Sequence, residues 1–213
     1  YNYCSCADGY LWKDGACKPK EDYSACKIGA LFYSDNTCSD KFESSKTLLG
    51  VVIYEKSASQ NGWIMTVKPV KTGIAWDTGS YYSTGITDKA VSASCTNTQK
   101  LVAKGSRFAA ANAANNYKPT GTPSGKKWCL PSYDLLNNLN NSVNFAKVNA
   151  GITTAGGKKI GFGTSSSYEY VWSSSEYDYY YAWYFYANTS GSFYMNSYGK
   201  NGYTASVRPV LAF

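Results

Sequence analysis

The sequence predicts an α+β fold with two helices and short antiparallel strands, preceded by a small disulfide-rich N-terminal segment. Three cysteines fall within the first 17 of 213 residues. From about Ile28, short runs of β-branched and aromatic residues begin, and two segments with helical spacing separate the early runs from the late ones. Strands, then helices, then more strands are typical of an α+β domain. We place the Cys-rich segment at residues 1–25 and the domain at residues 26–213.

The first predicted strands form an antiparallel hairpin. Residues 51–54 (VVIY) and 63–67 (WIMTV) are rich in β-branched and aromatic residues and flank the turn-like segment SASQNG. The run ALFYS precedes this hairpin as a further strand, and residues 74–76 (IAW) add a short strand after it.

Two helices are expected next. The segment TQKLVAKGSRFAAANAANNY has apolar residues near helical spacing, with Asn97 or Thr98 as its N-cap and Gly105 as a weak point in its middle. The second helix follows WCLP, where Ser132 is a natural N-cap. Its apolar face is formed by leucines: Leu135, Leu136 and Leu139. Gly- and Ser-rich loops such as TTAGGKKIGFGTSSS come next, and the chain ends in extended segments.

The composition argues against several functions. The net charge of +7 comes from 19 lysines spread along the chain and only two arginines, whereas nucleic-acid recognition recruits clustered arginine. Histidine is absent, which removes the usual general base at neutral pH and the commonest metal ligand. No apolar run approaches the roughly 18 residues that cross a bilayer. We expect no catalysis, no cofactor or metal, no nucleic-acid partner and no membrane insertion.

The cysteine pattern predicts a disulfide framework in an oxidising compartment. None of the seven cysteines forms a CxxC pair, and no histidine can complete a zinc site, so structural zinc is disfavoured. Disulfides favour a secreted or bacterial cell-surface location. Cys26 pairs most simply with Cys38, and Cys95 with Cys129, although the sequence does not determine the connectivity.

The opening CSCADGYLWKDGAC resembles the second half of an epidermal-growth-factor-like module, through the spacing C-x-C-x-x-G-Y followed by six residues and C. The resemblance implies a disulfide between Cys6 and Cys17 and a partner for Cys4 that lies before Tyr1. We therefore expect this chain to be a processed or trimmed part of a longer secreted protein. A small secreted disulfide knot of another kind is the alternative.

The C-terminal stretch YDYYYAWYFYANTSGSFYMNSYGKNGYTAS holds nine of the 21 tyrosines. Its residues alternate in character on both sides of the turn-like NTSG, as in a β-hairpin whose successive side chains point to opposite faces. The face expected in the core consists of Trp183, Phe185, Phe193 and Met195. The opposite face is expected to present tyrosine, serine and asparagine to solvent.

The residue types of this stretch indicate a binding surface. Of its 30 residues, 22 are Tyr, Ser, Asn, Asp, Gly or Thr, which antibody combining loops also favour because tyrosine supplies contact area at little entropic cost. A surface this aromatic would risk self-association without a partner. We expect a macromolecular ligand, most simply a protein. A tyrosine ladder that only stabilises an exposed sheet is the alternative.

The motifs WCLPSYDLLNNL and VWSSSE, followed by a Tyr/Ser/Asn/Gly block centred on AW and ending in SVRPVLAF, resemble the variable proteins of diversity-generating retroelements. The resemblance covers about residues 28–213 and implies a C-type-lectin-like fold with a variable region at about 172–213. In that family a reverse transcriptase copies a template repeat with errors at adenines. Asparagine codons consequently become Tyr, Ser, Asp, Gly or Thr codons between fixed apolar residues.

The same resemblance implies roles for individual residues. Scaffold positions are Trp172, Trp183, Phe185, Arg208 and Pro209. The ligand-facing set is Tyr177, Asp178, Tyr179, Tyr180, Tyr181, Tyr184, Tyr186, Asn188, Ser190, Ser192, Tyr194, Asn196, Ser197, Tyr198, Asn201 and Tyr203.

These roles lead to expectations about stability. Glu176 and Arg208 flank the block and are expected to pair across its ends. Replacing Trp183 or Phe185 with Ala should cost about 3–5 kcal/mol because a cavity forms. Little loss of thermal stability is expected when three tyrosines of the polar face become Ser together: Tyr184, Tyr186 and Tyr194.

Three other functions compete with variable-ligand binding. A calcium-dependent lectin needs several converging oxygen ligands, and the tripeptides Glu-Pro-Asn, Gln-Pro-Asp and Trp-Asn-Asp are absent. An enzyme of the formylglycine-generating family, which shares the lectin-like fold, needs cysteines near the C-terminus, and none follows Cys129. A fixed-specificity surface adhesin or pilus-associated lectin-like protein would bind through the same face, so the sequence alone does not separate it from a variable protein.

Overall fold

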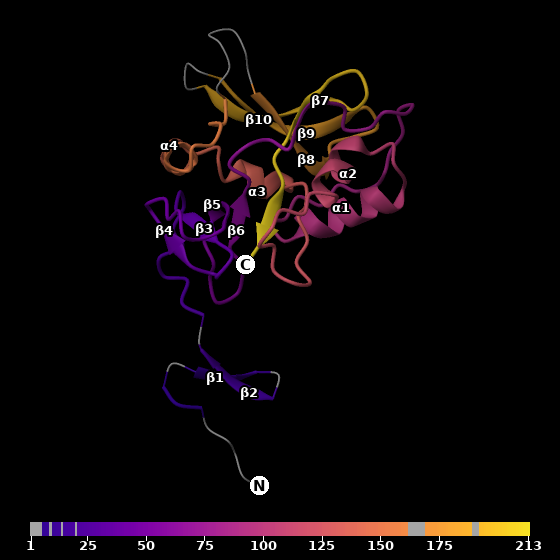
Figure 1. Cartoon of the computed structure of the whole chain (residues 1–213). Helices are drawn as coiled ribbons and strands as arrows, with labels where there is room; N and C mark the ends of the chain where they lie inside the picture. Colours follow the sequence, from indigo (N-terminus) through magenta and orange to yellow (C-terminus); the bar gives the residue numbers. More distant parts are fainter. Residues whose placement is uncertain (1–5, 9, 14, 20, 162–168, 189–191) are drawn as a thin grey trace.

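The computed structural model describes residues 6–8, 10–13, 15–19, 21–161, 169–188 and 192–213. In Figure 1 a small N-terminal hairpin lies apart from the main body. Its strands, β1 (Tyr10–Lys13) and β2 (Ala16–Pro19), pair antiparallel. A disulfide joins Cys6 to Cys17 across this segment. The main body combines helices with two further sheets, which confirms the predicted α+β class.

The first sheet of the main body is built around the predicted hairpin. Its strand order is β12-β6-β5-β3-β4, and β5 pairs antiparallel with β6 as expected. The last strand of the chain pairs with β6, so the C-terminus returns to the first half of the sequence. The Cys26–Cys38 disulfide connects the segment that precedes β3 to β4. The strands are β3 (Leu31–Tyr33), β4 (Cys38–Ser39), β5 (Leu48–Tyr54), β6 (Trp63–Met65) and β12 (Val210–Ala212).

The second sheet carries the tyrosine-rich stretch and has the strand order β10-β9-β8-β11-β7. Most neighbours are antiparallel, whereas β11 runs parallel to β8. The short strand expected at residues 74–76 lies earlier in the chain, at residues 71–74. Trp76 follows this strand, and its side chain is buried. The strands are β7 (Lys71–Ile74), β8 (Glu169–Glu176), β9 (Tyr181–Ala187), β10 (Phe193–Gly199) and β11 (Ala205–Val207).

The first predicted helix is two helices, α1 (Ala93–Ala103) and α2 (Ala109–Asn115). Gly105 separates them with φ 122°, a backbone conformation that residues with a Cβ rarely adopt. The predicted N-cap was wrong, because α1 begins earlier and Thr98 lies inside it. The Thr98 hydroxyl accepts from Leu130 N at 2.9 Å and thereby ties α1 to the following segment.

The second predicted helix begins where expected, but another helix follows it. Ser132 precedes α3 (Tyr133–Asn137) in an extended conformation, although its side chain makes no cap hydrogen bond. The Ser132 hydroxyl instead accepts from Ser94 Oγ at 3.1 Å. The helix α4 (Ser142–Thr154) was not predicted, and the Asn141 side chain caps it by accepting from two backbone N–H groups.

Both faces of the second sheet are covered around β8 and β9, which decides the environment of their side chains. Val171 and Phe185 point into the core shared with α3, α4 and the first sheet. Trp172 and Tyr184 are sequence neighbours of Val171 and Phe185 and point to the opposite face. They belong to a second buried cluster with side chains of α1 and α2. In Figure 1, α3 lies between the two sheets, and α1 and α2 lie together beside the second sheet. No helix within the described residues is long and apolar enough to span a membrane.

Candidate functional site

The predicted hairpin is formed by β9 and β10, and its side chains alternate between two faces as expected. Tyr186 lies opposite Tyr194, and Phe185 lies opposite Met195. Phe185 is fully buried, and Met195 and Phe193 pack against the same core. The predicted apolar face is therefore confirmed for these three residues.

Trp183 departs from the predicted core position, because its side chain is only half-buried. It sits at the edge of the core, with the rings of Tyr133 and Tyr177 at 4.5 and 4.7 Å between centroids. The Lys89 ammonium lies 4.5 Å from the centre of the Trp183 ring, within the range of a cation–π interaction. Trp183 thus connects the core to the surface.

Two tyrosines of the predicted ligand-facing set lie on the expected face but are not exposed. Tyr184 and Tyr186 are 4% and 8% exposed, so the prediction that they face solvent was wrong. The cause is the second buried cluster, which covers this face of the sheet as well. Tyr170 of β8 contributes to their burial, with ring centroids 5.2 Å from Tyr184 and 5.5 Å from Tyr186.

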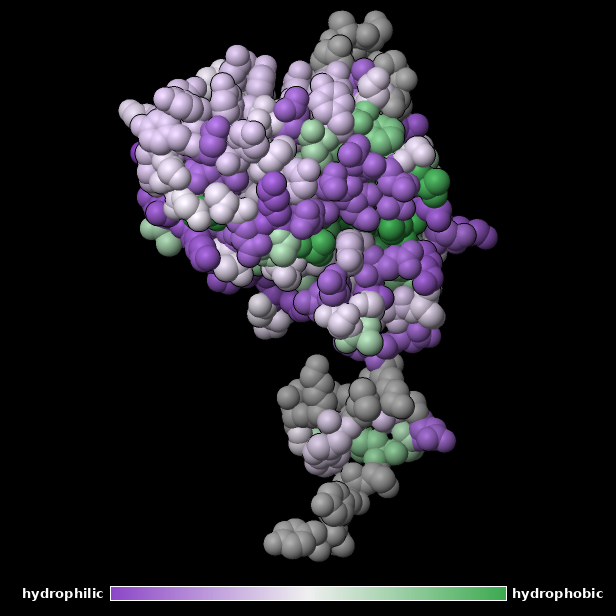
Figure 2. Space-filling view, turned by 180° about the vertical axis from the view of Figure 1, so that it is seen from behind, coloured by the Kyte–Doolittle hydropathy of each residue, from purple (hydrophilic) through white to green (hydrophobic). Residues whose placement is uncertain are grey.

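Six other tyrosines of the set are exposed, and we call them the tyrosine surface. They are 42–52% exposed: Tyr177, Tyr179, Tyr180, Tyr181, Tyr194 and Tyr203. Three smaller polar members are exposed beside them, namely Ser192, Asn196 and Asn201, while Asp178, Asn188, Ser197 and Tyr198 are half-buried. Ser190 lies outside the described residues. In Figure 2 the upper part of the main body, where Figure 1 places the second sheet, shows mostly pale side chains of intermediate hydropathy.

The turn between β8 and β9 holds three of these tyrosines, Tyr177, Tyr179 and Tyr180, in a defined conformation. The Asp178 carboxylate accepts from the backbone N–H groups of Tyr180 and Tyr181, both at 2.8 Å. Tyr177 N also donates to Tyr181 O at 3.0 Å. Asp side chains stabilise turns in this way by hydrogen bonding to their own backbone. The exposed rings therefore project from an ordered turn.

A buried ion pair anchors this turn from beneath. The side chains of Lys200 and Glu176 are both 0% exposed, and the Lys200 ammonium donates to the Glu176 carboxylate. Lys200 also donates to Tyr179 O and Tyr82 O, each at 3.0 Å. Glu176 accepts from Thr84 N at 2.7 Å. One charge pair consequently fixes both the turn and the segment around residues 82–84.

The segment at residues 77–86 brings a further tyrosine to the surface that sequence reasoning missed. The Tyr81 ring lies 5.4 Å from that of Tyr180. The segment is held by a bidentate pair between Arg107 and Asp77, with both N–O distances at 2.7 Å. Asn201 Nδ2 adds a hydrogen bond to Gly79 O at 3.0 Å. The signal was present, because DTGSYYSTG has the same residue types as the C-terminal stretch.

Gly199 lies where tyrosines of the C-terminal stretch come close to Tyr81 of the 77–86 segment. A Cβ at this position would lie 2.9 Å from the Tyr203 ring and 3.4 Å from the Tyr81 hydroxyl. The Tyr203 ring in turn packs at a tilt against that of Tyr198, with ring centroids 3.6 Å apart. Rings from β10, the following turn and the 77–86 segment thus adjoin one another around a residue without a side chain.

The predicted pair between Glu176 and Arg208 was wrong, because each has another buried partner. Arg208 binds Glu169 in a bidentate arrangement, with N–O distances of 2.8 and 3.0 Å. Its Nη2 also donates to Lys158 O at 2.7 Å. Planar bidentate geometry of this kind suits a buried arginine. The third disulfide, Cys95–Cys129, is present as predicted.

The chemistry of the site is that of neutral phenols. Burial raises the pKa of Tyr184 and that of Tyr198 above the usual value of 10.0. These two phenols are therefore protonated at neutral pH, and a phenol can both donate and accept hydrogen bonds. Among the described residues, no group of three or more His, Cys, Asp or Glu could hold a metal ion.

Comparisons with known proteins show a fold relationship. No protein-family model matches the chain, and no curated protein matches its sequence. Among solved structures, the fold is similar to that of a fimbrial protein from Bacteroides ovatus, with a TM-score of 0.58 and 14% sequence identity. The match covers 88% of this chain and 49% of the fimbrial protein, so the chain spans about half the length of that protein. At this identity the similarity shows the fold alone.

Proposed function

We propose that the tyrosine surface binds a macromolecular ligand, most simply a protein. One observation carries the proposal: six tyrosines of a single 30-residue stretch are each 42–52% exposed. Aromatic side chains exposed together favour a partner, because they lose water-accessible apolar area on binding. A few of them should act as anchors, with the polar neighbours tuning the fit.

The ordered turn supports this proposal energetically. Binding costs free energy when side chains and loops must be ordered, and a preformed surface reduces that cost. The Asp178 hydrogen bonds and the Lys200–Glu176 pair order the turn before any ligand arrives. Matured antibody surfaces gain affinity from the same combination of tyrosine and preorganisation.

The finer proposal is that the chain is a variable protein of a diversity-generating retroelement, with a C-type-lectin-like domain. It is supported by the ordered motifs from Trp128 onward and by the polar residues that alternate with apolar ones in the C-terminal stretch. The alternative is a fixed-specificity surface adhesin or pilus-associated protein, which the fold similarity to a fimbrial protein favours. Both functions use the tyrosine surface, and the disulfides suit a secreted or cell-surface location.

Photo-crosslinking tests the binding surface. A photoreactive phenylalanine placed at Tyr194 or Tyr179 should crosslink to a specific macromolecule from cell-surface fractions. The matched control is the same substitution at Phe42, which is 50% exposed but lies outside the stretch. Equal crosslinking from Phe42 and from the two tyrosine positions would refute a dedicated surface.

Sequencing tests the retroelement. The source genome should contain a reverse-transcriptase gene beside a near-identical repeat that differs from this gene mainly at adenines. Sequencing the 3′ end of the gene across a growing population should then show variation confined to the ligand-facing positions. A single invariant sequence with no such repeat would favour the fixed adhesin.

A further inference from the structure

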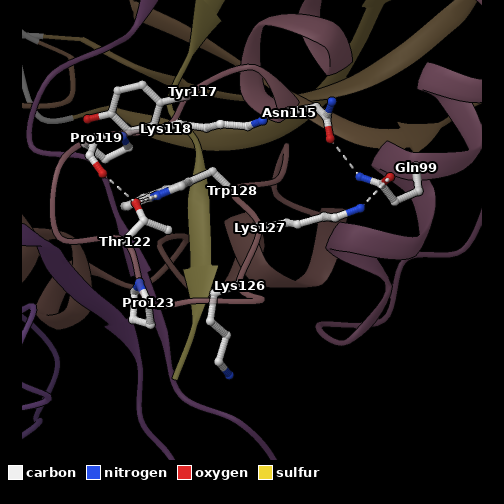
Figure 3. Close-up of a pocket in the computed structure, with 10 residues that line it drawn as sticks. All are labelled: Gln99, Asn115, Tyr117, Lys118, Pro119, Thr122, Pro123, Lys126, Lys127 and Trp128. Atoms are coloured by element: carbon white, nitrogen blue, oxygen red, sulfur yellow. Dashed lines mark hydrogen bonds between the residues drawn. The ribbon is translucent and has the colours of Figure 1, made fainter.

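A cleft elsewhere in the main body shares no residue with the tyrosine surface. It is a cleft of about 430 Å³ between the helices α1 and α2 and the segment that leads to Trp128 (Figure 3). Trp128 is buried, and its indole N–H donates to Thr122 Oγ1 at 3.0 Å. The Thr122 hydroxyl donates to Pro119 O at 2.8 Å. The Tyr117 ring packs edge-on against Trp128 at 5.1 Å, so one wall of the cleft is aromatic and fixed.

The opposite wall is polar. Gln99 Nε2 donates to Asn115 Oδ1 at 2.9 Å, which joins α1 to α2. Lys127 Nζ donates to Gln99 Oε1 at 3.4 Å and extends the row. This row presents amide and ammonium groups side by side, and such groups can hydrogen bond to hydroxyls and to anionic oxygens.

The charge of the cleft is uniformly positive. Lys118, Lys126 and Lys127 line it, and none of the described residues that line it is acidic. In Figure 3 the side chains of Lys118 and Lys127 extend toward Gln99 and Asn115, whereas Lys126 extends away.

Some lysines elsewhere in the chain are paired with carboxylates. Lys27 pairs with Glu55, and Lys46 with Asp35. Within the part of the chain that the structure describes, the cleft lysines have no such pair. Uncompensated positive charge around a concave site raises the local concentration of anions.

We propose that this cleft binds a small anionic saccharide of one or two rings that carries a carboxylate or a sulfate. The volume lies in the range of small-molecule sites. Lys118 and Lys127 would contact the anionic group, and the Gln99–Asn115 row would contact hydroxyls. The partly exposed Tyr117 ring, held in place by the buried Trp128, suits the apolar face of a sugar ring. A phosphate-rich or planar acidic ligand is less well matched, because the cleft offers no guanidinium fork.

The test is a calorimetric and NMR titration of the whole chain with four sugars. The chondroitin sulfate disaccharide carries both anionic groups, the hyaluronan disaccharide carries only a carboxylate, glucose 6-sulfate carries only a sulfate, and lactose is neutral. We expect saturable binding of at least one anionic sugar, with no binding of lactose. The Trp128 indole N–H resonance should shift, which places the ligand in the cleft. Raising the salt from about 0.02 M to 0.3 M should weaken binding because it screens the lysines.

A charge-matched pair of variants separates the cleft from general basicity. Lys118→Gln with Lys127→Gln should weaken binding of the anionic sugar by about tenfold or more. Lys68→Gln with Lys71→Gln removes the same charge from exposed positions outside the cleft and should change affinity by less than about twofold.

Several results would overturn the proposal. They are equal losses in the two double variants, equal binding of lactose, binding that leaves the Trp128 resonance unmoved, and failure of every anionic sugar to saturate. Tighter binding of AMP or of a tetra-aspartate peptide than of any sugar would also overturn it. A Tyr194→Ala variant should bind the sugar normally, so failure here is distinct from failure of the tyrosine surface.

Discussion

The turn between β8 and β9 and the strands beside it contain the same residue type in opposite environments. In the turn, Tyr179 and Tyr180 are 47% and 52% exposed. In β9, Tyr184 and Tyr186 are 4% and 8% exposed. A strand directs every second side chain to the same face, and at Tyr184 and Tyr186 that face is covered by other elements. The turn leaves the sheet and β10 forms its edge, so side chains there, including that of Tyr194, escape the cover. Tyrosine content therefore does not identify a contact residue until burial is known.

The two regions also differ in what holds them. The strand tyrosines are held by ring packing, as between Tyr170 and Tyr184. The turn is held by polar groups, namely the Asp178 carboxylate and the Lys200–Glu176 pair. Different substitutions should therefore disturb the two regions.

The largest effect is expected from the charge beneath the turn. Lys200→Met leaves the Glu176 carboxylate buried without its cation and should cost about 3–5 kcal/mol of unfolding free energy. Urea unfolding at pH 7 measures this loss. Adding Glu176→Gln should recover part of the stability, because the buried charge is then removed. A loss below about 1 kcal/mol in the single variant would show that water reaches the pair.

The next effect concerns the strand tyrosines. Tyr184→Ala should cost about 3 kcal/mol or more, because it removes a buried aromatic ring and leaves a cavity. The triple change of Tyr184, Tyr186 and Tyr194 to Ser is now expected to destabilise the protein, contrary to the expectation from the sequence. Calorimetric melting measures both variants. An unchanged melting temperature for Tyr184→Ala would mean that the ring is exposed after all.

Alkaline pH should act on the strand tyrosines next. Burial raises the pKa of Tyr184 and that of Tyr198 above 10.0. The unfolded chain ionises first, so this stability is fully present below pH 10 and is lost as the pH rises from there toward the folded-state pKa values. Urea unfolding at pH 8 and at about pH 11 measures the decrease. Tyr184→Phe should make the decrease smaller than in the parent protein. An unchanged decrease in this variant would contradict the assignment.

The smallest effect on stability is expected in the turn. Tyr179→Ala should change the unfolding free energy by no more than about 0.5 kcal/mol, as is usual for an exposed side chain. Combined with a photoreactive phenylalanine at Tyr194, the same variant should show reduced crosslinking to the ligand. A large loss of stability together with retained crosslinking would reverse the roles of turn and strand.

Part of the fold was predictable because it depends on local order. Alternation across residues 183–195 predicted the hairpin and the burial of Phe185, since strand geometry follows from the backbone alone. Gly105 was predicted to weaken a single helix, whereas in the structure it separates two helices. The helix α4 has apolar residues at helical spacing, Phe145, Val148 and Ile152, yet it was missed among Gly and Asn residues.

Gly151 shows why such a helix escapes sequence reasoning. A glycine in a helix interior normally costs about 1 kcal/mol relative to alanine. Here the carbonyl of Gly29 approaches so closely that no Cβ would fit. The residue that argues against a helix locally is required by a neighbour 122 positions earlier in the chain.

The sequence by itself determined the α+β class, the hairpin with its two faces, and a stretch of residue types suited to binding. The tertiary structure alone decided which tyrosines are exposed. Alternation shows which side chains share a face of the sheet, but not whether other elements, here α1 and α2, cover that face. It also decided that Glu176 pairs with Lys200 and Glu169 with Arg208. Charges attract any opposite partner, so their pairing depends on which elements the fold brings together in a water-poor interior.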